Sequence, residues 1–418
     1  MNFSFSMSRR RLLQTALATS GAALVGWLPG CQDSPPDGSP LTHPPGTQSL
    51  PPTAPRPLVP PPPAPIRLEK PRVLGPLTPA LIAVPEQLPE PQIRIKLTDD
   101  MPQPPVIRKG AYRGRIDIVK VPQAGGGVKY AAVNSVPMEA YLQGVLAKEL
   151  YGSWELAAYQ AQAIAARTFA LYSLKTHMLL APGKLWDLSD DQGSQMYGGI
   201  AGETAKAKAA VAATKGQVLM FLQPAPAPSG IFCSRYSACS GGASQDPFEA
   251  WGDASLPPLS GRVLGPVDNN CPKYQWPTLP VSKFDVTRCM RSWGERNAFA
   301  HLLKLGAIRG VTVAKRNALT GRPTELQLTD TAGRTAPIRA EEFRIALLTD
   351  PAGQAPKPFS SFFELQDAGT NILLTGGRGY GHGIGLSQWG AQAMALQART
   401  HGQILGFYYP GASLRTLW

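Results

Sequence analysis

One acidic side chain, Glu149, stands where a proton donor could act. It ends an expected helix that begins near Pro137. Apolar and aromatic residues follow it: Leu150, Tyr151 and Trp154. Because burial among such neighbours disfavours the charged form of a carboxyl, Glu149 could keep a proton for donation, and cleavage of a glycosidic bond needs such an acid. The alternative is a structural carboxylate, paired with Lys148 or Arg167 at the helix end.

The stretch of residues 377–391 has glycine at every second position from 377 to 385, and His382 lies within this run. Glycine has no side chain to pack and loses the most entropy on folding, so the run predicts a loop whose backbone approaches a ligand. The alternative is a bulged strand in which His382 is a hydrogen-bonded core histidine. A Ser-His-Asp triad through His382 and Ser387 is a weaker hypothesis, because no G-x-S-x-G turn accompanies it.

Other polar side chains could bind a polyhydroxylated ligand. Hydroxyl and amide groups lie at loop positions near glycines, on Tyr197, Ser240 and Gln388. Such ligands favour neutral hydrogen-bonding groups and aromatic faces. Gln162 and Arg167 lie on an expected alanine-rich helix, where long polar side chains among small ones predict buried hydrogen bonds. These two either orient a site or tie helices together.

Four cysteines follow Cys31: Cys233, Cys239, Cys271 and Cys289. In an exported chain, an even number favours two disulfides, with three connectivities to choose from. Cys233 and Cys239, beside a Ser-Gly-Gly turn, could instead hold a metal ion such as zinc. Neither has a second cysteine or a histidine at close zinc-finger spacing, so the metal is the minority interpretation.

The chain is basic, with 41 lysines and arginines against 28 aspartates and glutamates and a formal net charge of +13. This charge raises a nucleic-acid hypothesis, but the basic residues are scattered and form no basic helix or aromatic-interleaved stripe. For an exported protein, an anionic envelope polymer or a membrane surface is the better electrostatic partner. We therefore expect no nucleic-acid partner.

Residues 1–31 predict export. The arginines 9–11 precede an uncharged run over residues 16–28, and Pro29-Gly30-Cys31 follows. This order is similar to a twin-arginine signal, and its end resembles a lipoprotein cleavage box that lipidates Cys31, although proline is unusual at its second position. The alternative is a plain cleaved signal in which Cys31 is incidental. Because the uncharged run is too short and glycine-rich for a membrane span, only an N-terminal anchor would hold the protein to a membrane.

The rest of the chain divides into a spacer and one folded domain. Residues 32–90 are rich in proline, which removes backbone donors and favours polyproline II, so we expect a disordered linker. Residues 91–418 are expected to form a single domain with mixed strands, a groove and a central alanine-rich helix over about 153–180. Strands and helices that come in blocks, without regular alternation, favour an α+β fold.

The periodicity also predicts the elements that must position these residues. Strands are expected over residues 92–97, 113–121, 128–136, 217–222 and 231–236. Residues 124–127 would form a hairpin turn. Helices are expected over about 137–152, 203–214, 339–348 and 387–399, with a short one around 296–305.

Four ordered blocks resemble the signature of the SpoIID/LytB family, the sporulation stage II protein D and amidase-enhancer group. The first comprises residues 136–145, Glu149 and residues 161–168. The second comprises residues 195–198 with 213–219, the third is Ser240-Gly241-Gly242, and the fourth is residues 377–391. The blocks span about residues 111–418, and four in order are far more specific than any one of them.

The resemblance implies one of two functions. Sporulation members are lytic transglycosylases, which cut the glycan strands of peptidoglycan, preferably after the stem peptides are removed. Amidase-enhancer members modify another wall hydrolase. The essential acid of the first group is similar in placement to Glu149, which would protonate the glycosidic oxygen and then assist attack by the sugar's own 6-hydroxyl. No water-activating partner or cofactor is required, which fits the lack of an evident second carboxylate: Glu139 is rotated by about 80° from Glu149 on an ideal helix.

We therefore expect a glycan-cleaving enzyme of the periplasm or cell envelope, possessing an N-terminal lipid anchor, with a wall amidase as partner in the alternative function. The expected ligand contacts are Gln162, Arg167, Tyr197, Ser240, Gly241, Gly242, His382, Ser387 and Gln388. Some family members hold zinc through cysteines near the Ser-Gly-Gly turn, where Cys233 and Cys239 lie. The chain departs from the family pattern after the acid, where Leu150-Tyr151-Gly152 replaces the usual methionine-proline.

Overall fold

The computed structural model of the protein describes residues 79–123, 126–190 and 194–418. The expected export segment, residues 1–31, and residues 32–78 of the expected linker lie outside the described residues, as do residues 124 and 125 of the expected hairpin turn. Among the described helices, none combines the length and the apolar character that a membrane span requires.

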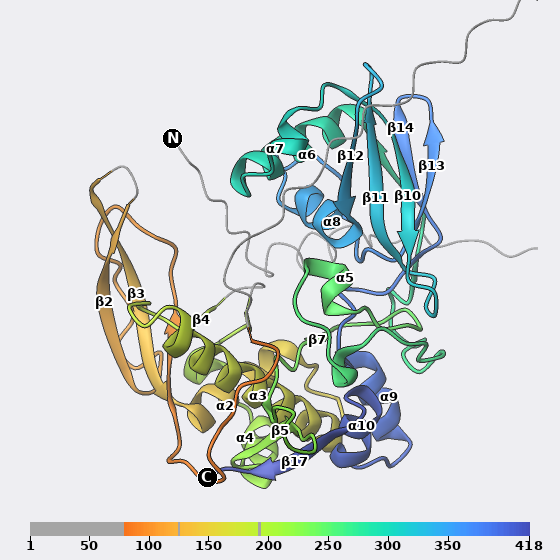
Figure 1. Ribbon diagram of the computed structural model, residues 1–418. Coiled ribbons are helices and arrows are strands. Elements are labelled where there is room, and N and C mark those ends of the chain that lie inside the picture. The colour runs from red at the N-terminus through yellow and green to blue at the C-terminus, as the bar shows by residue number, and fades with distance from the viewer. Residues whose placement is uncertain (1–78, 124–125, 191–193) are drawn as a thin grey trace, which may run out of the picture. The chain divides into compact units, whose positions relative to one another are not determined.

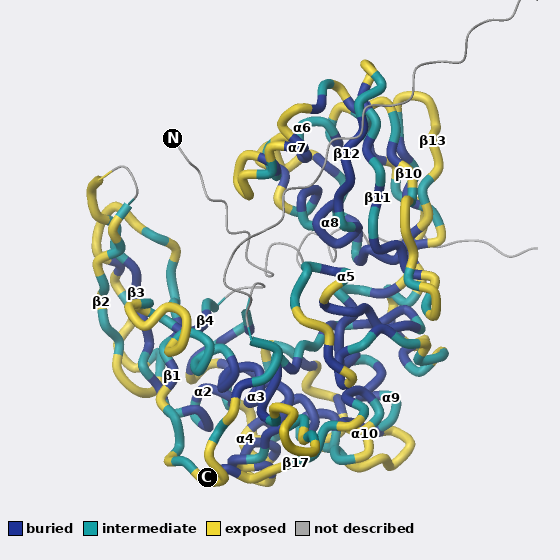
Figure 2. The backbone as a smooth tube through the Cα atoms, in the orientation of Figure 1, coloured by how far each residue is buried: buried dark blue, intermediate teal, exposed yellow. Residues whose placement is uncertain are grey.

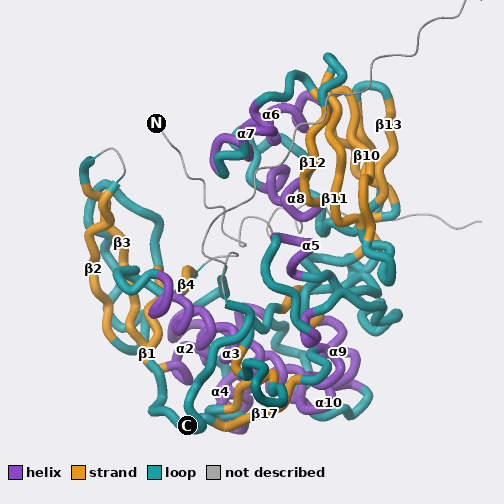
Figure 3. Tube along the Cα trace, viewed as in Figure 1, coloured by secondary structure: helices purple, strands orange, loops and turns teal. Residues whose placement is uncertain are grey.

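Helices and strands are mixed throughout the described chain, as expected for an α+β fold (Figures 1 and 3). The helices are α2 (Met138–Glu149), α3 (Leu156–Leu180), α4 (Ala205–Ala213), α5 (Pro247–Trp251), α6 (Lys283–Arg296), α7 (Ala300–Leu303), α8 (Ala340–Leu348), α9 (Gln388–Leu396) and α10 (His401–Tyr408). The longer strands are β1 (Gln92–Lys96), β2 (Arg115–Pro122), β3 (Val128–Pro137), β5 (Gln217–Phe221), β9 (Leu279–Ser282), β10 (Ile308–Arg316), β11 (Pro323–Asp330), β12 (Thr335–Arg339), β13 (Glu364–Ala368), β14 (Asn371–Thr375) and β17 (Ala412–Thr416). The two-residue strands are β4 (Leu188–Ser189), β6 (Gly230–Ile231), β7 (Tyr236–Ser237), β8 (Gln275–Trp276), β15 (Gly377–Arg378) and β16 (Leu386–Ser387).

The first three expected strands form a sheet in the order β2-β3-β1-β4. β3 pairs antiparallel with both β1 and β2, and the β2–β3 pairing runs as far as Pro122 opposite Val128. Ile93 and Ile95 of β1 are fully buried, because alternate side chains of a strand point to the same face. These three strand predictions are confirmed.

Residues 79–90, which the sequence placed in the linker, pack against the folded chain. Ile82 is buried and pairs with Ile231 in an isolated bridge. The backbone nitrogen of Leu88 donates to the carbonyl of Leu417 at 2.8 Å. The folded part of the described chain therefore begins before residue 91.

Helix α3 is surrounded by other elements. It contacts α2, α4, α9, α10 and β5, and the side chains from Ala161 to Ala166 are fully buried (Figure 2). Alanine side chains allow neighbouring helices to approach closely, so α3 can pack on several sides at once. β5, which follows α4, pairs with β17 near the C-terminus and with β6.

Residues 279–375, which we call the insert, have a hydrophobic core of their own. Two three-stranded sheets, β10-β11-β12 and β13-β14-β9, lie in this segment, and α6 and α8 pack on its strands. Phe343 of α8 and Leu326 of β11 are fully buried there. The rest of the described chain, which we call the motif region, carries all four motif blocks.

One element prediction was wrong, and another missed a longer helix beside the expected one. The strand expected over residues 231–236 is broken into β6 and β7, because the backbone nitrogen of Arg235 turns back to the carbonyl of Cys233 at 2.8 Å. The short helix expected around residues 296–305 is preceded by a longer one, α6, whose first turn is capped by Ser282. Only α7 lies inside the expected range.

Candidate functional site

Glu149, the last residue of α2, is held by two segments that are distant in sequence. The backbone nitrogen of Met196 donates to its Oε1 at 2.9 Å, and the amide Nε2 of Gln388 donates to its Oε2 at 3.2 Å. The side chain is half-buried. Three of the four motif blocks therefore meet at one carboxyl group. A protonated carboxyl still accepts hydrogen bonds on its oxygens, so these contacts are compatible with either protonation state.

The Met196 backbone is fixed by the side chain that precedes it. Gln195 is buried, and its Oε1 accepts from the hydroxyl of Tyr141 at 2.9 Å. Its Nε2 donates to the hydroxyl of Tyr236 at 3.0 Å and to the carbonyl of Ala166 at 3.2 Å. Burial raises the pKa of Tyr141, so its hydroxyl remains a donor. Gln195 thus joins α2, α3 and β7 directly behind the Glu149 contact.

Tyr197 fixes the same segment from the other side and lies in the core. Its backbone nitrogen donates to Oδ1 of Asp190 at 2.6 Å, and its hydroxyl donates to Oδ1 of Asn134 at 3.1 Å. Its ring packs between those of Tyr112 and Tyr141, with centroids 5.6 and 5.0 Å away. Only 4% of the residue is exposed, so the structure gives Tyr197 a supporting position behind the site.

Gln388 is positioned by the cap of α9. The Ser387 hydroxyl accepts from the backbone nitrogen of Gly390 at 3.2 Å and donates to Oδ2 of Asp268 at 2.7 Å. The same carboxylate oxygen accepts from the backbone nitrogen and the hydroxyl of Ser240, at 2.5 and 2.7 Å. Asp268, which is fully buried, therefore joins the third and fourth motif blocks.

The same bonds place Ser387 and the Ser240 turn in structural positions. Ser387 directs its hydroxyl to Asp268 and not to His382, so the triad hypothesis has no support here. Ser240 is 2% exposed, and its hydroxyl also accepts from the backbone nitrogen of Gly242 at 3.2 Å. Gly241 lies against Gly379: a Cβ added to Gly241 would stand 2.7 Å from the backbone nitrogen of Gly379.

The glycine run of the fourth block closely approaches the protein's own backbone. An added Cβ on Gly385 would stand 2.1 Å from the carbonyl oxygen of Arg235, and φ of Gly385 is +67°, where side chains are disfavoured. The nitrogen of Leu386 donates to the same Arg235 carbonyl at 3.2 Å. The sequence thus predicted a close approach, but at this position the neighbour is the chain itself and not a ligand.

His382 is hydrogen-bonded within its own loop. Its Nδ1 accepts from the backbone nitrogen of Ile384 at 2.9 Å, and its ring meets the ring of Trp251 edge-on at 5.3 Å. Burial, with the nearby charge of Arg235, lowers the pKa of His382 to about 3. The imidazole is therefore neutral at physiological pH, which supports the core-histidine alternative.

One arginine of the insert lies beneath this loop. Arg322 is 1% exposed, and its Nε donates to Oε1 of Gln245 at 2.6 Å. Its Nη1 donates to the carbonyls of Ser240 and Ala243, at 3.2 and 3.0 Å. Burial lowers the pKa of Arg322 to about 10, so it remains charged at neutral pH. The Nη1 atom would be only 2.9 Å from a Cβ on Gly383.

Arg167 and Gln162 are fully buried. Arg167 forms a bidentate ion pair with Glu139, through Nε at 3.0 Å and Nη2 at 2.6 Å, and donates through Nη1 to the carbonyl of Gln217. Glu139 Oε1 also accepts from the indole nitrogen of Trp418 at 3.0 Å. Arg167 thus ties α3 to α2 and the C-terminus. Its ion-pair partner is Glu139, whereas from the sequence Arg167 was considered as a partner of Glu149. Within the described chain, neither amide atom of Gln162 has a hydrogen-bond partner.

The cysteines do not form the two expected disulfides, and all four are free thiols. Cys239 shares a side-chain hydrogen bond with Cys271. This bond and burial both raise the pKa of Cys239, whereas the same bond lowers the pKa of Cys271 against the opposing effect of burial. Cys233 packs against the core around α2 and α3, whereas Cys289 lies in the core of the insert. These two therefore cannot pair.

The described residues also do not fit the minority interpretation of Cys233 and Cys239 as a zinc site. No group of three or more histidine, cysteine, aspartate or glutamate side chains in the described ranges could hold a metal ion. The buried thiol of Cys239 is directed to Cys271, and Cys233 lies near Arg235, a cation that would oppose a second positive charge.

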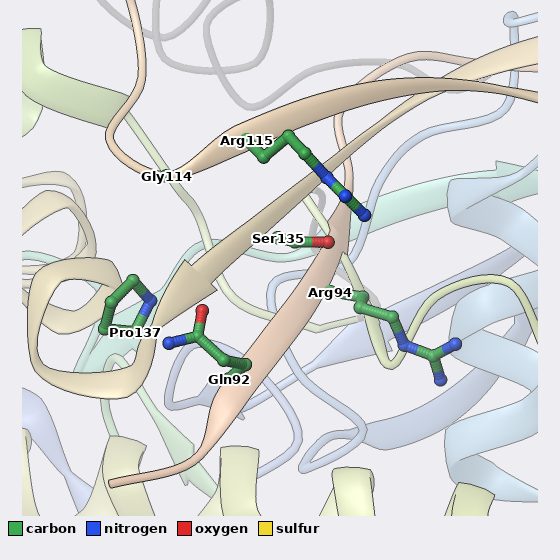
Figure 4. Close-up of a pocket in the computed structure, with 6 residues that line it drawn as sticks. All are labelled: Gln92, Arg94, Gly114, Arg115, Ser135 and Pro137. Carbon is green, nitrogen blue, oxygen red and sulfur yellow. The ribbon is translucent and has the colours of Figure 1, made fainter.

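A pocket of about 630 Å³ lies at the other end of α2 (Figure 4). Its lining residues come from β1, β2, β3 and the residue before β2: Gln92, Arg94, Gly114, Arg115, Ser135 and Pro137. Pro137 caps the start of α2, so about 18 Å of helix separates this pocket from Glu149. We place the candidate site at Glu149 because the motif blocks converge there.

Several site residues were missed by the sequence reasoning. Met196 acts through a backbone nitrogen, which no residue type reveals. Asp268 and Arg322 stand outside every motif block and reach the site only through the fold. Gln195 offered a signal, because it opens a motif block in which only Tyr197 had been singled out.

Part of this arrangement lies within a match to a known protein family. Residues 127–221 match the family model SpoIID, described as stage II sporulation protein. That stretch includes Glu149, Met196 and the first two motif blocks, whereas the third and fourth blocks lie beyond it.

Curated relatives match over a longer stretch. The amidase enhancer of Bacillus subtilis is 27% identical over 305 residues, which cover 65% of this chain but only 40% of that protein. The stage II sporulation protein D of the same organism is 28% identical over 296 residues, 68% of this chain and 76% of that protein. An uncharacterized protein of Brachyspira hyodysenteriae is 27% identical over 284 residues, 68% of this chain and 67% of that protein.

Proposed function

The chain belongs to the SpoIID/LytB family, and from this premise we propose that it cleaves the glycan strands of peptidoglycan as a lytic transglycosylase, with Glu149 as acid and base. The observation that carries the proposal is the convergence of three motif blocks on this one carboxyl. Met196 and Gln388 come from segments 47 and 239 residues away in sequence, and both donate to it.

The reaction needs one carboxyl group. Protonated Glu149 gives its proton to the glycosidic oxygen as the bond from that oxygen to the anomeric carbon breaks. The 6-hydroxyl oxygen of the same sugar forms the new bond to the anomeric carbon and releases its proton to the Glu149 carboxylate. The products are a 1,6-anhydro end and a free hydroxyl end, no water is consumed, and Glu149 is protonated again.

The neighbouring groups serve to hold Glu149 in one orientation through both steps. The Met196 nitrogen and the Gln388 amide donate to different oxygens of the carboxyl group, which fixes its plane. A correctly oriented acid accounts for a large part of the rate gain in such reactions. Asp268 and Gln195 act one step further away, because they fix Ser387 and Met196.

The site of action we propose is the cell envelope. The export signal, the Cys31 box and the proline-rich segment support an exported protein, held at the membrane by an N-terminal lipid and extended toward the wall by its linker. The net charge of +13 supports an anionic polymer as partner.

A second function is favoured by the match to an amidase enhancer. In that function the protein binds peptidoglycan and stimulates a cell-wall amidase without cutting glycan itself. The groups around Glu149 would then hold a glycan strand, and the carboxyl would accept hydrogen bonds from sugar hydroxyls.

The test uses the purified full-length chain on intact and denuded peptidoglycan, with mass spectrometry of the released fragments. We expect anhydro-muramyl ends from the wild type and at least a thousand-fold fewer from Glu149→Gln, an estimate on the order of what loss of the reacting acid costs. Glu155→Gln is the matched control, because Glu155 is an exposed carboxylate six residues further on. Equal product from wild type and Glu149→Gln would refute Glu149 as the acid.

The amidase function is tested in the same preparations by adding a purified cell-wall amidase. Stimulation that survives in Glu149→Gln, together with no anhydro ends from folded wild type, would favour the non-catalytic function.

A further inference from the structure

An aromatic cluster lies on the two segments that follow Glu149 and Gln388. Tyr151, two residues after the acid, contacts Trp154 and Trp389, with ring centroids 5.4 and 5.8 Å away. Trp154 and Trp389 meet edge-on at 5.2 Å. Trp389 directly follows Gln388, the residue that donates to Glu149. The cluster is therefore linked to the acid in two ways: Tyr151 follows Glu149 along the chain, and Trp389 follows the residue that donates to it.

The three rings differ in exposure. Trp154 is 6% exposed and Trp389 is half-buried, whereas Tyr151 is 56% exposed. A large apolar ring next to a polar site normally packs inward, and Tyr151 instead rests on two tryptophans and presents its remaining surface to solvent.

The backbone that carries Tyr151 is held firmly. Its carbonyl accepts from the nitrogen of Trp154 at 3.0 Å and from the hydroxyl of Tyr159 at 3.1 Å. The Nζ of Lys206 donates to the carbonyls of Gly152 and Trp154, at 2.8 and 2.5 Å. An exposed ring on a fixed backbone loses little entropy when it binds a ligand.

The ligand that suits this surface is a sugar ring. The C–H face of a pyranose is apolar and packs on an aromatic ring, while its hydroxyls and amide need polar neighbours such as Glu149 and Gln388. Gly152 adds no side chain, and an added Cβ there would meet nothing within 4 Å, so the space beside Tyr151 is open.

We infer that Tyr151, supported by Trp154 and Trp389, is a sugar-stacking subsite that places one N-acetylated pyranose of the glycan strand next to Glu149. This inference rests on the proposed function for the identity of the ligand. Tyr151 is then a positioning residue, and it sets how tightly the strand is held.

The experiment measures binding of a denuded glycan tetrasaccharide to the full-length chain in the Glu149→Gln background, where no turnover occurs. Tryptophan fluorescence can report binding, because Trp154 and Trp389 lie in contact with Tyr151. We expect Tyr151→Ala to weaken binding about ten-fold and Tyr151→Phe to stay within about two-fold of the parent, because stacking requires the ring and not the hydroxyl. Phe284→Ala is the matched control, since Phe284 is an exposed aromatic of the insert, 74% exposed, and should change nothing.

The outcomes separate this inference from the proposed function. Equal binding by Tyr151→Ala and the parent overturns the inference, even if the wild type makes anhydro ends. Weaker binding by Tyr151→Ala with recovery in Tyr151→Phe supports it, even if no anhydro ends form and the amidase function is correct. A Tyr151→Phe variant as weak as Tyr151→Ala would also overturn it, because the hydroxyl would then carry the binding.

Discussion

The motif region and the insert are built on different principles. The insert buries its apolar residues between two sheets and two helices, and its buried carboxylates Asp330 and Glu341 pair with arginines only four and three residues away. In the motif region the buried polar groups join segments that are distant in sequence, as Asp268 does for Ser240 and Ser387 and as the pair of Arg167 with Glu139 does for α3 and α2. Buried polar groups are costly unless they are paired, so they occur where geometry must be fixed. The insert therefore supplies mainly packing, and the motif region supplies orientation.

The two regions meet in buried contacts that cross this division. Arg322 of the insert donates to carbonyls of the Ser240 turn, below the glycine loop. Ser360 of the insert, which is also buried, donates to the carbonyl of Arg378 in the glycine run. If the division of labour is correct, most substitutions in the insert change stability alone, and such contact residues are the exceptions that also change the site. The following predictions test this division.

The largest effect is expected inside the motif region, at Arg167→Met. Arg167 and Glu139 are both buried, and removal of one partner leaves an uncompensated charge, which costs about 3 to 5 kcal/mol. We expect the free energy of unfolding, measured by urea denaturation, to fall by that amount. A double variant, Arg167→Met with Glu139→Leu, should recover much of the loss. A loss below about 1 kcal/mol in the single variant would show that the buried pair does not hold α2 and α3 together.

The next largest effect is expected at Arg322→Met. This change removes a buried cation together with its three hydrogen bonds and leaves the Ser240 and Ala243 carbonyls without this donor. We expect the free energy of unfolding to fall by about 2 to 4 kcal/mol. Because the Ser240 turn leads through Asp268 to Ser387, anhydro-end formation should fall as well.

The matched control for Arg322 is Arg316→Met on neighbouring β10. Arg316 pairs with Glu364 at the surface, so its loss should cost less than about 1 kcal/mol and leave activity unchanged. If Arg322→Met lost stability with full activity in the folded fraction, the insert would be a separate packing unit with no part in the site.

These contacts mark what the sequence could and could not predict. The position of Glu149 at the end of a helix was predictable, because an acid at a helix end beside apolar residues is a local pattern. Strands β1 to β3 and helix α8 were predictable for the same reason, since their periodicity lies within a few residues. The glycine run predicted a close approach of the backbone, but a glycine does not indicate whether its neighbour is a ligand or the chain itself.

The remaining contacts were beyond sequence reasoning because they join distant segments. Asp268 joins Ser240 to Ser387 across 28 and 119 residues, and no local pattern around it signals that role. Helix α6 was missed although the sequence carried its signals: Ser282 and Asp285 at the cap, and Val286, Cys289, Met290 and Trp293 at helical spacing. Cys239 and Cys271 lie together while Cys233 and Cys289 do not, which a count of cysteines cannot reveal.

A smaller effect is expected in the pH dependence of stability at His382, where the regions adjoin. Its pKa is about 3 in the folded chain and 6.5 in the unfolded chain, so the unfolded state takes up a proton first as the pH falls. The stabilisation is complete above pH 6.5 and is lost progressively as the pH falls toward 3. Between pH 7 and 5 the wild type should lose about 2 kcal/mol more than His382→Gln.

The direct measurement for His382 is the titration of its imidazole by NMR. A midpoint near 6.5 would contradict the neutral histidine and reopen its role as an acid or base. A midpoint well below 5 would leave it as a structural part of the loop.

The smallest effect is expected at Gln388→Leu, which separates orientation from packing within the motif region itself. Leucine is similar in volume and keeps the start of α9, which Ser387 caps through its own hydroxyl. The change removes one 3.2 Å hydrogen bond to Glu149 and leaves the Met196 contact, so kcat/KM for anhydro-end formation should fall about ten-fold, equivalent to about 1.4 kcal/mol. Gln327→Leu on β11 of the insert is the control and should leave kcat/KM unchanged. The lost bond orients the acid and does not bind the glycan strand. We therefore expect kcat to fall while the affinity for the strand is unchanged. A rise in KM at constant kcat would instead assign Gln388 to the strand, and the two donors to Glu149 would then have different tasks.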